Sequence, residues 1–242
     1  MVYPPVSPYD PPFHPPARPV RPIRALAIAV VVTLGVGALV DVFSLVVTFE
    51  RLSLVSGLID SPDSVDISAV ETNDSWYALC GVVDTAAYVL TGVVFVVWLY
   101  RARSNAEAIT PIAHRRSKSL LIFGWIIPIA SLWLPKQVVD DIWVTSTPQD
   151  PPLNPRHPTA LEGARHSGLV WAWWLTWLIA FWGAGFFYRA ARGDDLGSEL
   201  LAVRTEIYFA IPVFAATVLA ALVVMRITQA QEARRAAAVP WG

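Results

Sequence analysis

The feature that most constrains this chain is a series of long apolar stretches, each long enough to cross a lipid bilayer. A spanning helix needs about 20 mostly apolar residues, because the hydrocarbon core is about 30 Å thick and each residue rises about 1.5 Å. Four stretches meet this test: 25–48, 76–100, 168–188 and 207–226. Each must be helical, since a lone strand would leave backbone groups unpaired in lipid. The sequence therefore predicts an all-α, polytopic transmembrane helix bundle.

A fifth apolar stretch, 119–134, is shorter and is interrupted by Pro128, with Pro135 directly after it. A straight helix from 119 to 136 would rise about 26 Å, nearly a full span. Proline kinks such a helix without forbidding it, because neighbouring groups can satisfy the freed carbonyls. We therefore expect five hydrophobic segments. The third either crosses, which its hydrophobicity favours, or dips into the membrane and returns.

Lysine and arginine in short loops set the orientation of such a bundle. The N-terminal tail and the loop 101–118 are cationic, whereas the loop 50–75 carries six carboxylates and one cation, Arg51. The N-terminus and the loop 101–118 are thus expected in the cytoplasm. If the third segment crosses, 11 of the 18 cations lie inside, and if it returns, 14 do. The charge rule favours re-entry, but the first positive loops usually dominate orientation, so we expect five crossings and keep re-entry open.

Composition supports a membrane protein and divides the chain into three parts. Charged residues make up 15% of the chain, against about 25% in soluble domains. The segment 1–24 holds nine prolines and is expected to be a disordered cytoplasmic tail, followed by a transmembrane domain at 25–227 and a short C-terminal tail at 228–242. The net charge of −1 gives no reason to expect nucleic acid.

Two aspartates inside apolar stretches suggest a polar cluster in the outer half of the membrane. Ionisable groups in hydrocarbon are costly and need a partner or a purpose. Asp41 lies about 24 Å from the inner edge of its stretch, and Asp84 about 12 Å below the outer edge of the next. If the third segment crosses, Lys136 and Asp140 also reach the outer edge. The candidate outer cluster is Asp41, Asp84, Lys136 and Asp140, serving either an ion or polar solute or only helix packing.

A second candidate site lies on the cytoplasmic side. Its residues are polar or cationic and could meet anionic lipid headgroups: Arg101, Arg103, Asn105, Arg115 and Arg116. We expect the lipid bilayer and these headgroups as partners, together with a homo-oligomer or a membrane partner protein.

No catalytic motif accompanies these sites. The chain has no Gly-rich phosphate loop, HExxH, GxSxG or CxxC, its four histidines fall at no metal-ligand spacing, and Cys80 is its one cysteine. We therefore expect neither cofactor nor metal. The leading interpretation is a non-enzymatic accessory or interaction module of the cell membrane. The alternative is a small channel or carrier using Asp41 and Asp84, and a lipid-acting membrane enzyme is less favoured.

Residues 98–105 read WLYRARSN and residues 124–135 read GWIIPIASLWLP. Together they resemble a bacterial, actinobacterial-type membrane-protein family of unknown function with W-L-x-R-A-x-x-N and G-W-x-x-P-x-A-x-L-W-x-P patterns. The acidic stretch 140–143, the pair Trp173-Trp174 and the stretch 226–231 are similar as well, although Ser131 stands where the family pattern has asparagine. The resemblance covers about residues 25–235. It implies an integral membrane bundle and no known activity.

Overall fold

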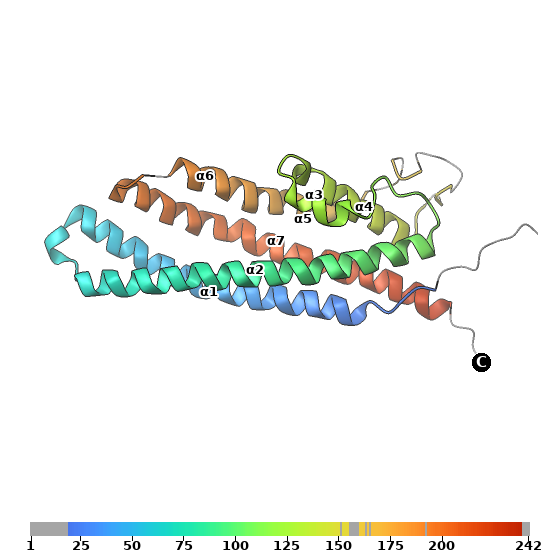
Figure 1. Cartoon of the computed structure of the whole chain (residues 1–242), viewed down its shortest axis with the longest axis horizontal. Coiled ribbons are helices and arrows are strands. Elements are labelled where there is room, and N and C mark those ends of the chain that lie inside the picture. The colour runs from blue at the N-terminus through green and yellow to red at the C-terminus, as the bar shows by residue number, and fades with distance from the viewer. Residues whose placement is uncertain are drawn as a thin grey trace, which may run out of the picture.

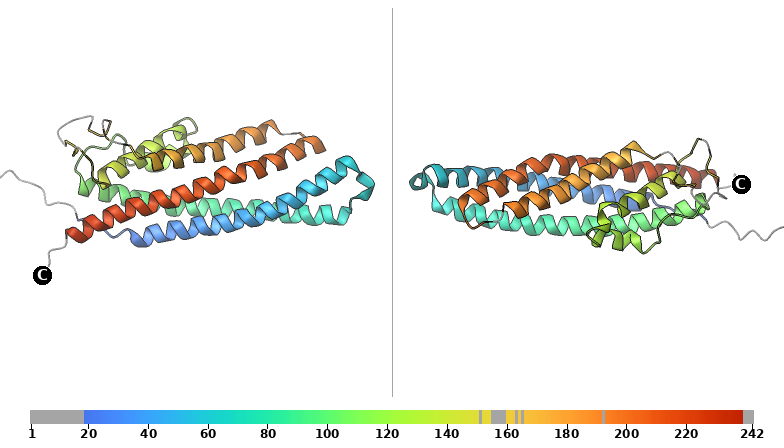
Figure 2. Two further views of the ribbon diagram at one scale, coloured as in Figure 1. Left: turned by 180° about the vertical axis from the view of Figure 1, so that it is seen from behind. Right: turned by 90° about the horizontal axis from the view of Figure 1, so that it is seen from above.

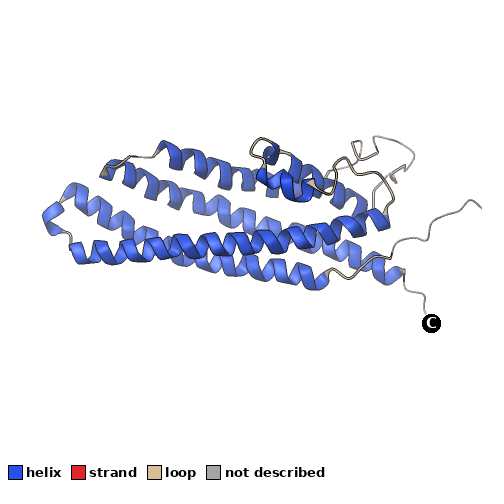
Figure 3. Cartoon of the chain, in the orientation of Figure 1, coloured by secondary structure: helices blue, strands red, loops and turns tan. Residues whose placement is uncertain are grey.

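Helices make up nearly all of the part of the chain that the structure describes. The computed structural model describes residues 19–150, 152–154, 160–162, 164, 166–191 and 193–238, so residues 1–18 of the expected proline-rich tail lie outside it. Within those ranges the chain forms helices joined by loops, with no strand (Figure 3). The prediction of an all-α fold is confirmed.

Four long helices run side by side along the molecule (Figure 1). They are α1 (Arg24–Asp60), α2 (Ile67–Ile109), α7 (Leu196–Ala237) and a composite helix made of α5 (Gly168–Leu178), the π-helical η3 (Ile179–Gly183) and α6 (Ala184–Ala190). Each is long enough and apolar enough to cross a membrane. These four helices support the expectation of a membrane protein.

Side-chain caps and one short turn fix where the long helices begin. The Asp66 carboxylate accepts the Ser68 N–H at 2.9 Å at the start of α2, and the Asp195 carboxylate accepts the Ser198 N–H at 3.0 Å at the start of α7. Such caps satisfy N–H groups that have no partner inside the helix. The turn η1 (Pro62–Ser64) joins α1 to α2, which makes the two helices antiparallel neighbours.

Much of the apolar surface of these helices faces outward. In the most apolar window of each long helix only 11–17% of the residues are buried. Leu39 on α1 and Ile211 on α7 are 72% and 76% exposed. Soluble monomers rarely expose large contiguous apolar patches, whereas a lipid-facing helix requires one. The outward apolar surface is therefore what a membrane environment favours.

The third apolar stretch does not form a long helix. It folds as α3 (Leu120–Ile126), the 3-10 turn η2 (Ala130–Leu132) and α4 (Leu134–Ser146), which together we call the α3–α4 hairpin. Pro128 lies in the break between the two helices, and Pro135 occupies the first turn of α4, where its missing N–H costs nothing. The two prolines therefore mark a reversal of the chain rather than a kinked spanning helix.

The hairpin leaves and returns at one end of the bundle. The Thr110 hydroxyl, just after α2, donates to the Thr145 carbonyl at 2.8 Å, and the Gln231 amide near the end of α7 donates to the Ser146 hydroxyl at 2.8 Å. Figures 1 and 2 show α3 and α4 in the half of the bundle that holds the C-terminal ends of α2 and α7. We call this the hairpin end; α1 begins there. Four long apolar helices are present in the described part of the chain, so the expected count of five segments is not confirmed.

The apolar core lies at the hairpin end and is rich in tryptophan. Trp98 and Trp174 are almost completely buried, and the ring of Trp125 from α3 contacts the rings of Trp173, Trp174 and Trp177 at centroid distances of 5.6–6.4 Å. The Trp174 indole N–H donates to the Leu132 carbonyl at 3.2 Å. The hairpin is thus packed into the core rather than lying loosely on it.

The helices extend well beyond the predicted apolar stretches. Most of the expected loop 50–75 belongs to α1 and α2, and most of the expected C-terminal tail belongs to α7, which ends at Ala237. Hydropathy detects only the part of a helix that lies in lipid, so it misses helical turns that continue into water.

Candidate functional site

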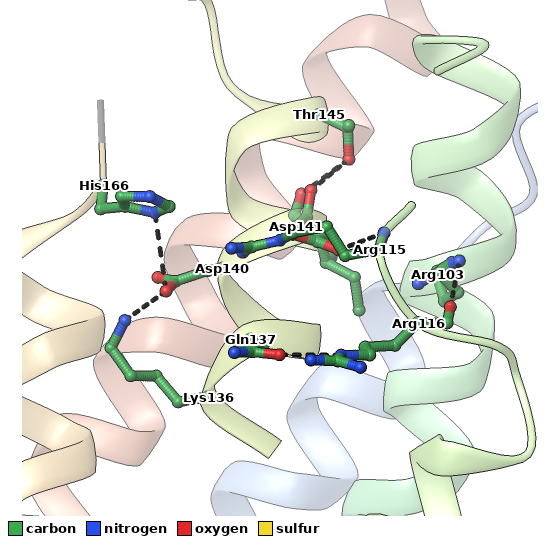
Figure 4. Close-up of polar contacts among 10 residues, drawn as sticks. Arg103, Arg115, Arg116, Lys136, Gln137, Asp140, Asp141, Thr145 and His166 are labelled. Atoms are coloured by element: carbon green, nitrogen blue, oxygen red, sulfur yellow. Dashed lines mark hydrogen bonds and ion pairs between the residues drawn. The ribbon is translucent and has the colours of Figure 1, made fainter. Parts of the chain in front are cut away.

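Three charged residues of the short helix α4 are buried, and they form the centre of the candidate site. Lys136, Asp140 and Asp141 are 8%, 1% and 1% exposed (Figure 4). Lys136 and Asp140 are four residues apart on one face, whereas Asp141 points toward the opposite side of the helix. Buried charges are expensive unless they are paired. The two aspartates therefore require partners from different neighbouring elements.

Asp140 connects α4 to the start of α5. Its carboxylate accepts a hydrogen bond from the Lys136 ammonium, and His166 Nδ1 lies 3.6 Å from the same oxygen, Oδ2. The Lys136 ammonium also lies 3.7 Å from the centroid of the Trp171 ring, a distance suited to cation–π attraction. One carboxylate oxygen of Asp140, Oδ1, is buried and has no hydrogen-bond partner among the described residues.

Asp141 connects α4 to the loop that precedes the hairpin. It accepts the backbone N–H of Arg115 at 2.9 Å and the guanidinium Nε at 2.7 Å, with Nη2 2.6 Å from the same carboxylate. Burial raises the pKa of Asp141, and the hydrogen bonds from Arg115 act in the opposite direction. On the same side of α4, Arg116 donates to the Gln137 amide oxygen at 2.8 Å.

Arg103 of α2 completes this side of the site. It is 4% exposed and donates to the Glu107 carboxylate at 2.9 Å and to the Arg116 carbonyl at 3.0 Å. Lys118 forms an ion pair with Glu107 at 2.8 Å. His114 lies beside this group, and burial followed by repulsion from Arg103 lowers its pKa to about 3, so it is neutral near pH 7.

A set of amide hydrogen bonds joins the chain segments of the hairpin end. Asn105 accepts the Arg21 N–H at 2.9 Å and donates to the Arg21 carbonyl at 2.8 Å, so it pairs with the backbone that leads into α1. Asn105 also donates to the Gln231 side-chain oxygen at 3.2 Å, and Gln231 donates to the Ala102 carbonyl at 2.9 Å in addition to Ser146. Asn105 and Gln231 therefore bring four separate segments together.

The expected inner site is consequently not an open one. Arg103 and Arg115 have carboxylate partners, Arg116 has an amide partner, and Asn105 is buried in backbone and amide contacts. Arg101 donates to the Pro22 carbonyl at 3.3 Å and has no carboxylate partner among the described residues. Of the four expected arginines, Arg101 and Arg116 have no carboxylate partner among the described residues, and Arg116 is bound to the Gln137 amide.

The four residues of the expected outer cluster divide between two places. Asp84 accepts the Ser44 hydroxyl at 2.8 Å and lies within electrostatic range of Asp41, so the two aspartates are neighbours across α1 and α2. Lys136 and Asp140 lie instead at the hairpin end with His166. The separation follows from the reversal of the third segment, which keeps α4 at the end where it started.

Sequence reasoning missed a second polar network at the opposite end of the bundle. Arg51 forms ion pairs with Asp74, at 2.6 Å, and with Glu199, and its guanidinium lies 4.4 Å from the centroid of the Tyr77 ring. Glu206 accepts the Tyr77 hydroxyl at 2.9 Å. Arg51 as the single cation of an acidic loop was the available signal. Glu206 directly precedes the apolar stretch 207–226, so it does not stand out as an ionisable group inside one.

The opposite end also contains a cavity of about 530 Å³ beside Arg51. Its polar lining includes Tyr188, Asp194 and Glu199. Among the described residues, no group of three or more His, Cys, Asp or Glu side chains could hold a metal ion.

Comparison with protein families assigns the chain to a family. Residues 62–229 match the domain of unknown function DUF4328. The chain belongs to this family. The DUF4328 match spans α2 to most of α7, and it therefore includes the α3–α4 hairpin and the buried charges of α4. No curated protein and no solved structure matches the chain.

Several residues of the stretches that suggested a family contact one another in this DUF4328 domain. Trp98 donates its indole N–H to the Thr228 hydroxyl at 3.1 Å, and Asn105 contacts Gln231. Trp125 contacts Trp173 within the aromatic core. These stretches, far apart in sequence, meet at the hairpin end.

Proposed function

We propose that this DUF4328 protein is a four-pass membrane protein that acts as a non-enzymatic accessory or interaction module. In this arrangement α1, α2, the α5–α6 helix and α7 cross the bilayer, and the α3–α4 hairpin stays in the cytoplasmic half. Both termini then lie in the cytoplasm. The exposed apolar faces of the four helices support the crossing, and the return of the hairpin to its starting end supports an even number of passes.

The distribution of cations supports the orientation. With a hairpin that returns, 14 of the 18 Lys and Arg residues fall on the side of the two termini and 4 on the other side. Short cytoplasmic loops carry such an excess in membrane proteins. The acidic loop between α1 and α2 would then face the outside.

The observation that carries the accessory role is the internal pairing of the hairpin end. A lipid-acting enzyme would need Asn105 and its neighbouring arginines to be open to a headgroup. Asn105 is instead bonded to Arg21 and Gln231, and Arg103 and Arg115 are paired with carboxylates. Groups engaged in this way join segments and hold a fixed shape, which suits a module that other membrane components contact.

A carrier of protons or cations is the second candidate, and one observation favours it. The Asp84 oxygen Oδ1 is buried and has no hydrogen-bond partner among the described residues, although Oδ2 is bonded to Ser44. Together with Asp41 and Glu206 it gives three carboxylates along α1, α2 and α7. Intramembrane carboxylates of this kind occur in ion and proton pathways.

Flux measurements distinguish the two candidates. The purified protein is reconstituted into liposomes with a trapped pH dye, and a potassium gradient with valinomycin sets the membrane potential. The accessory role predicts the proton flux of empty liposomes. A flux that disappears in Asp84→Asn, and persists in the loop control Asp150→Asn, would establish the carrier instead.

Cysteine labelling tests the topology. In a Cys80→Ser background, single cysteines replace Ser64, Ser117 and Ala237, which are all exposed. We expect an impermeant maleimide to label position 64 in intact cells, and positions 117 and 237 only after permeabilisation. Labelling of position 237 in intact cells would contradict the four-pass arrangement.

An accessory role requires a membrane partner or a second copy of this chain. Phe123 on α3 is 55% exposed and offers a position for a photo-crosslinking amino acid. A discrete crosslinked protein species, either a dimer or a complex of defined mass, is the expected result, and crosslinks to lipid alone would count against the role.

A further inference from the structure

The cations at the hairpin end fall into two groups that the sequence alone does not separate. One group is paired inside the protein: Arg103 and Lys118 with Glu107, Arg115 with Asp141, and Lys136 with Asp140. These side chains hold the hairpin in place. They have little charge left for an outside partner.

The other group has no carboxylate partner among the described residues. It comprises Arg21, Arg24, Arg101, Arg116, Arg226 and Arg234. Arg116 is bound to the Gln137 amide, and Arg226 lies about two turns before Arg234 along α7, nearer the apolar stretch. We call the remaining four residues, Arg21, Arg24, Arg101 and Arg234, the arginine patch. Arg21, Arg24 and Arg234 are exposed, and Arg101 is partly exposed. A cation that is both exposed and unpaired is free to bind an anion.

Three of the four members of the arginine patch are gathered around one short segment, residues 21–24. Arg21 and Arg24 belong to it, and the Arg101 guanidinium reaches the Pro22 carbonyl at 3.3 Å. Arg234 of α7 lies two residues from Glu232, whose carboxylate accepts the Ile23 N–H at 2.8 Å and the Arg24 N–H at 3.2 Å, so Arg234 stands at the same end of the bundle. The patch thus combines α1, α2 and α7.

The backbone beneath the patch is fixed from two sides. Asn105 bonds both the N–H and the carbonyl of Arg21, and Glu232 bonds the first N–H groups of α1. The Glu232 oxygens are already occupied by these N–H groups and by Arg235 at 2.8 Å. The patch therefore keeps a net positive charge on a fixed frame.

The position of the patch along α1 indicates which anion it meets. Arg24 is the first residue of α1, and exposed apolar side chains follow within one to two turns: Ile28 is 54% and Val32 57% exposed. An arginine cluster at the edge of an outward apolar surface suits a ligand with a phosphate head and an apolar tail. Arginine binds phosphate oxygens through two N–H groups at once.

We propose that the arginine patch binds the headgroup of an anionic phospholipid of the cytoplasmic leaflet, with the acyl chains lying along α1. The assignment to the cytoplasmic leaflet rests on the topology under the proposed function. The choice of an anionic headgroup rests on the unpaired arginines alone. Arg103, Asn105, Arg115 and Arg116, which the sequence suggested for this role, are engaged inside the protein. The patch replaces them and shares only Arg101 with the expected set.

The test is a titration of fluorescent phosphatidylglycerol into the full-length protein in neutral detergent. Each cation near a membrane surface changes anionic-lipid affinity about fivefold. We expect Arg234→Gln to raise the Kd about fivefold and Arg21→Gln/Arg24→Gln about 25-fold. The matched control Arg189→Gln/Arg204→Gln removes two exposed arginines from the opposite end of the bundle, where Arg189 bonds only the Gly185 carbonyl. It should leave the Kd unchanged.

Competition identifies the source of the phosphate. Unlabelled phosphatidylglycerol should displace the probe, whereas phosphatidylcholine and millimolar inorganic phosphate should not. Displacement by inorganic phosphate alone would replace the lipid with a soluble anion and overturn the proposal. An unchanged Kd in both patch variants would overturn it as well.

Arg234→Gln also guards against loss of the fold, because Arg234 has no ion-pair partner among the described residues. Failure of the lipid proposal can be distinguished from failure of the topology. The titration uses detergent and does not depend on which side of the membrane the patch faces. The cysteine map reports the side directly and does not depend on lipid binding.

Discussion

Gln231→Ala should strongly destabilise the hairpin end, although the Gln231 side chain carries no charge. Gln231 is completely buried, and its amide makes three hydrogen bonds, to Asn105, Ala102 and Ser146, at 2.8–3.2 Å. Truncation removes all three bonds, although Asn105 keeps its bonds to Arg21. Each buried hydrogen bond contributes about 1 kcal/mol in water-soluble proteins. The same bond between helices in lipid contributes about 0.6 kcal/mol.

The position of Gln231 decides which value applies. It lies five residues beyond Arg226, where the last apolar stretch ends, or about 7 Å farther along α7. We therefore place it in the protein interior outside the hydrocarbon and expect a loss of about 3 kcal/mol. For a chain of this size that corresponds to a fall in Tm of about 6–12 °C.

Thermal unfolding in a mild detergent, followed by tryptophan fluorescence, provides the assay. Gln229→Ala is the matched control, because Gln229 lies on the same turn of α7, is exposed, and should change Tm by less than about 1 °C. If Gln231→Ala lowered Tm no more than Gln229→Ala, the claim that this amide joins the segments would be refuted. A loss below about 2 kcal/mol would instead indicate that the hairpin end lies within lipid.

Three further perturbations address other parts of the structure. Lys136→Met removes the ion-pair partner of the buried Asp140 carboxylate, which leaves only His166 beside it, and should cost about 3–5 kcal/mol in chemical unfolding. Gly183→Ala would bring a Cβ to 2.7 Å from a ring carbon of Phe209, an overpacking that should cost about 1–3 kcal/mol in the same assay. Acid should destabilise the fold between pH 6.5 and about 3, because the unfolded chain protonates His114 in that window and the folded chain does not. The slope is at most about 1.4 kcal/mol per pH unit, and His114→Gln should flatten it.

Each of these predictions has a control on the same element. Lys136→Met combined with Asp140→Leu removes both charges and should recover most of the lost stability, so a double variant as unstable as the single one would contradict the ion-pair argument. Gly185→Ala meets only ordinary contact, at 3.5 Å, and should be nearly neutral. For the acid effect, an unaltered slope in His114→Gln would assign the proton uptake to another group.

The sequence was sufficient for the long helices because lipid imposes a length and composition that hydropathy detects directly. Apolar stretches at 25–48, 76–100, 168–188 and 207–226 each lie within one of the four long helices. It was not sufficient for the hairpin, since 119–134 has the hydropathy of a span but lacks its continuity. Pro128 and Pro135 indicated where the helix is interrupted. Their effect depended on neighbours, because the Trp125 and Trp174 contacts that stabilise the reversal come from elements far apart in sequence.

The same reversal explains why the candidate site was only partly predictable. Rise per residue placed Asp41 and Asp84 in one region, and they are neighbours. Extending the argument to Lys136 required the third segment to cross, and the charge count already opposed that choice. Burial of arginines could not be foreseen from loop composition, because it depends on contacts with other segments. Arg115 meets Asp141 of α4, and Arg103, which pairs with Glu107 one turn along α2, is covered by the loop through the Arg116 carbonyl, whereas Arg101 reaches only the Pro22 carbonyl.

The stretches that suggested a family now have a physical interpretation. Trp98 and Asn105 on α2 bond Thr228 and Gln231 on α7, and Asn105 also holds the backbone at Arg21. That backbone carries two members of the arginine patch, so residues that fix the hairpin end also fix where unpaired charge is presented. Asn105→Ala should therefore weaken phosphatidylglycerol binding although Asn105 carries no charge and contacts no lipid in this proposal. The Arg21→Gln/Arg24→Gln variant should lose binding without the fall in Tm that Asn105→Ala causes, because its backbone contacts stay intact. If Asn105→Ala lowered Tm and left the lipid Kd unchanged, the fixed frame beneath the arginines would be unnecessary, and charge alone would account for the binding.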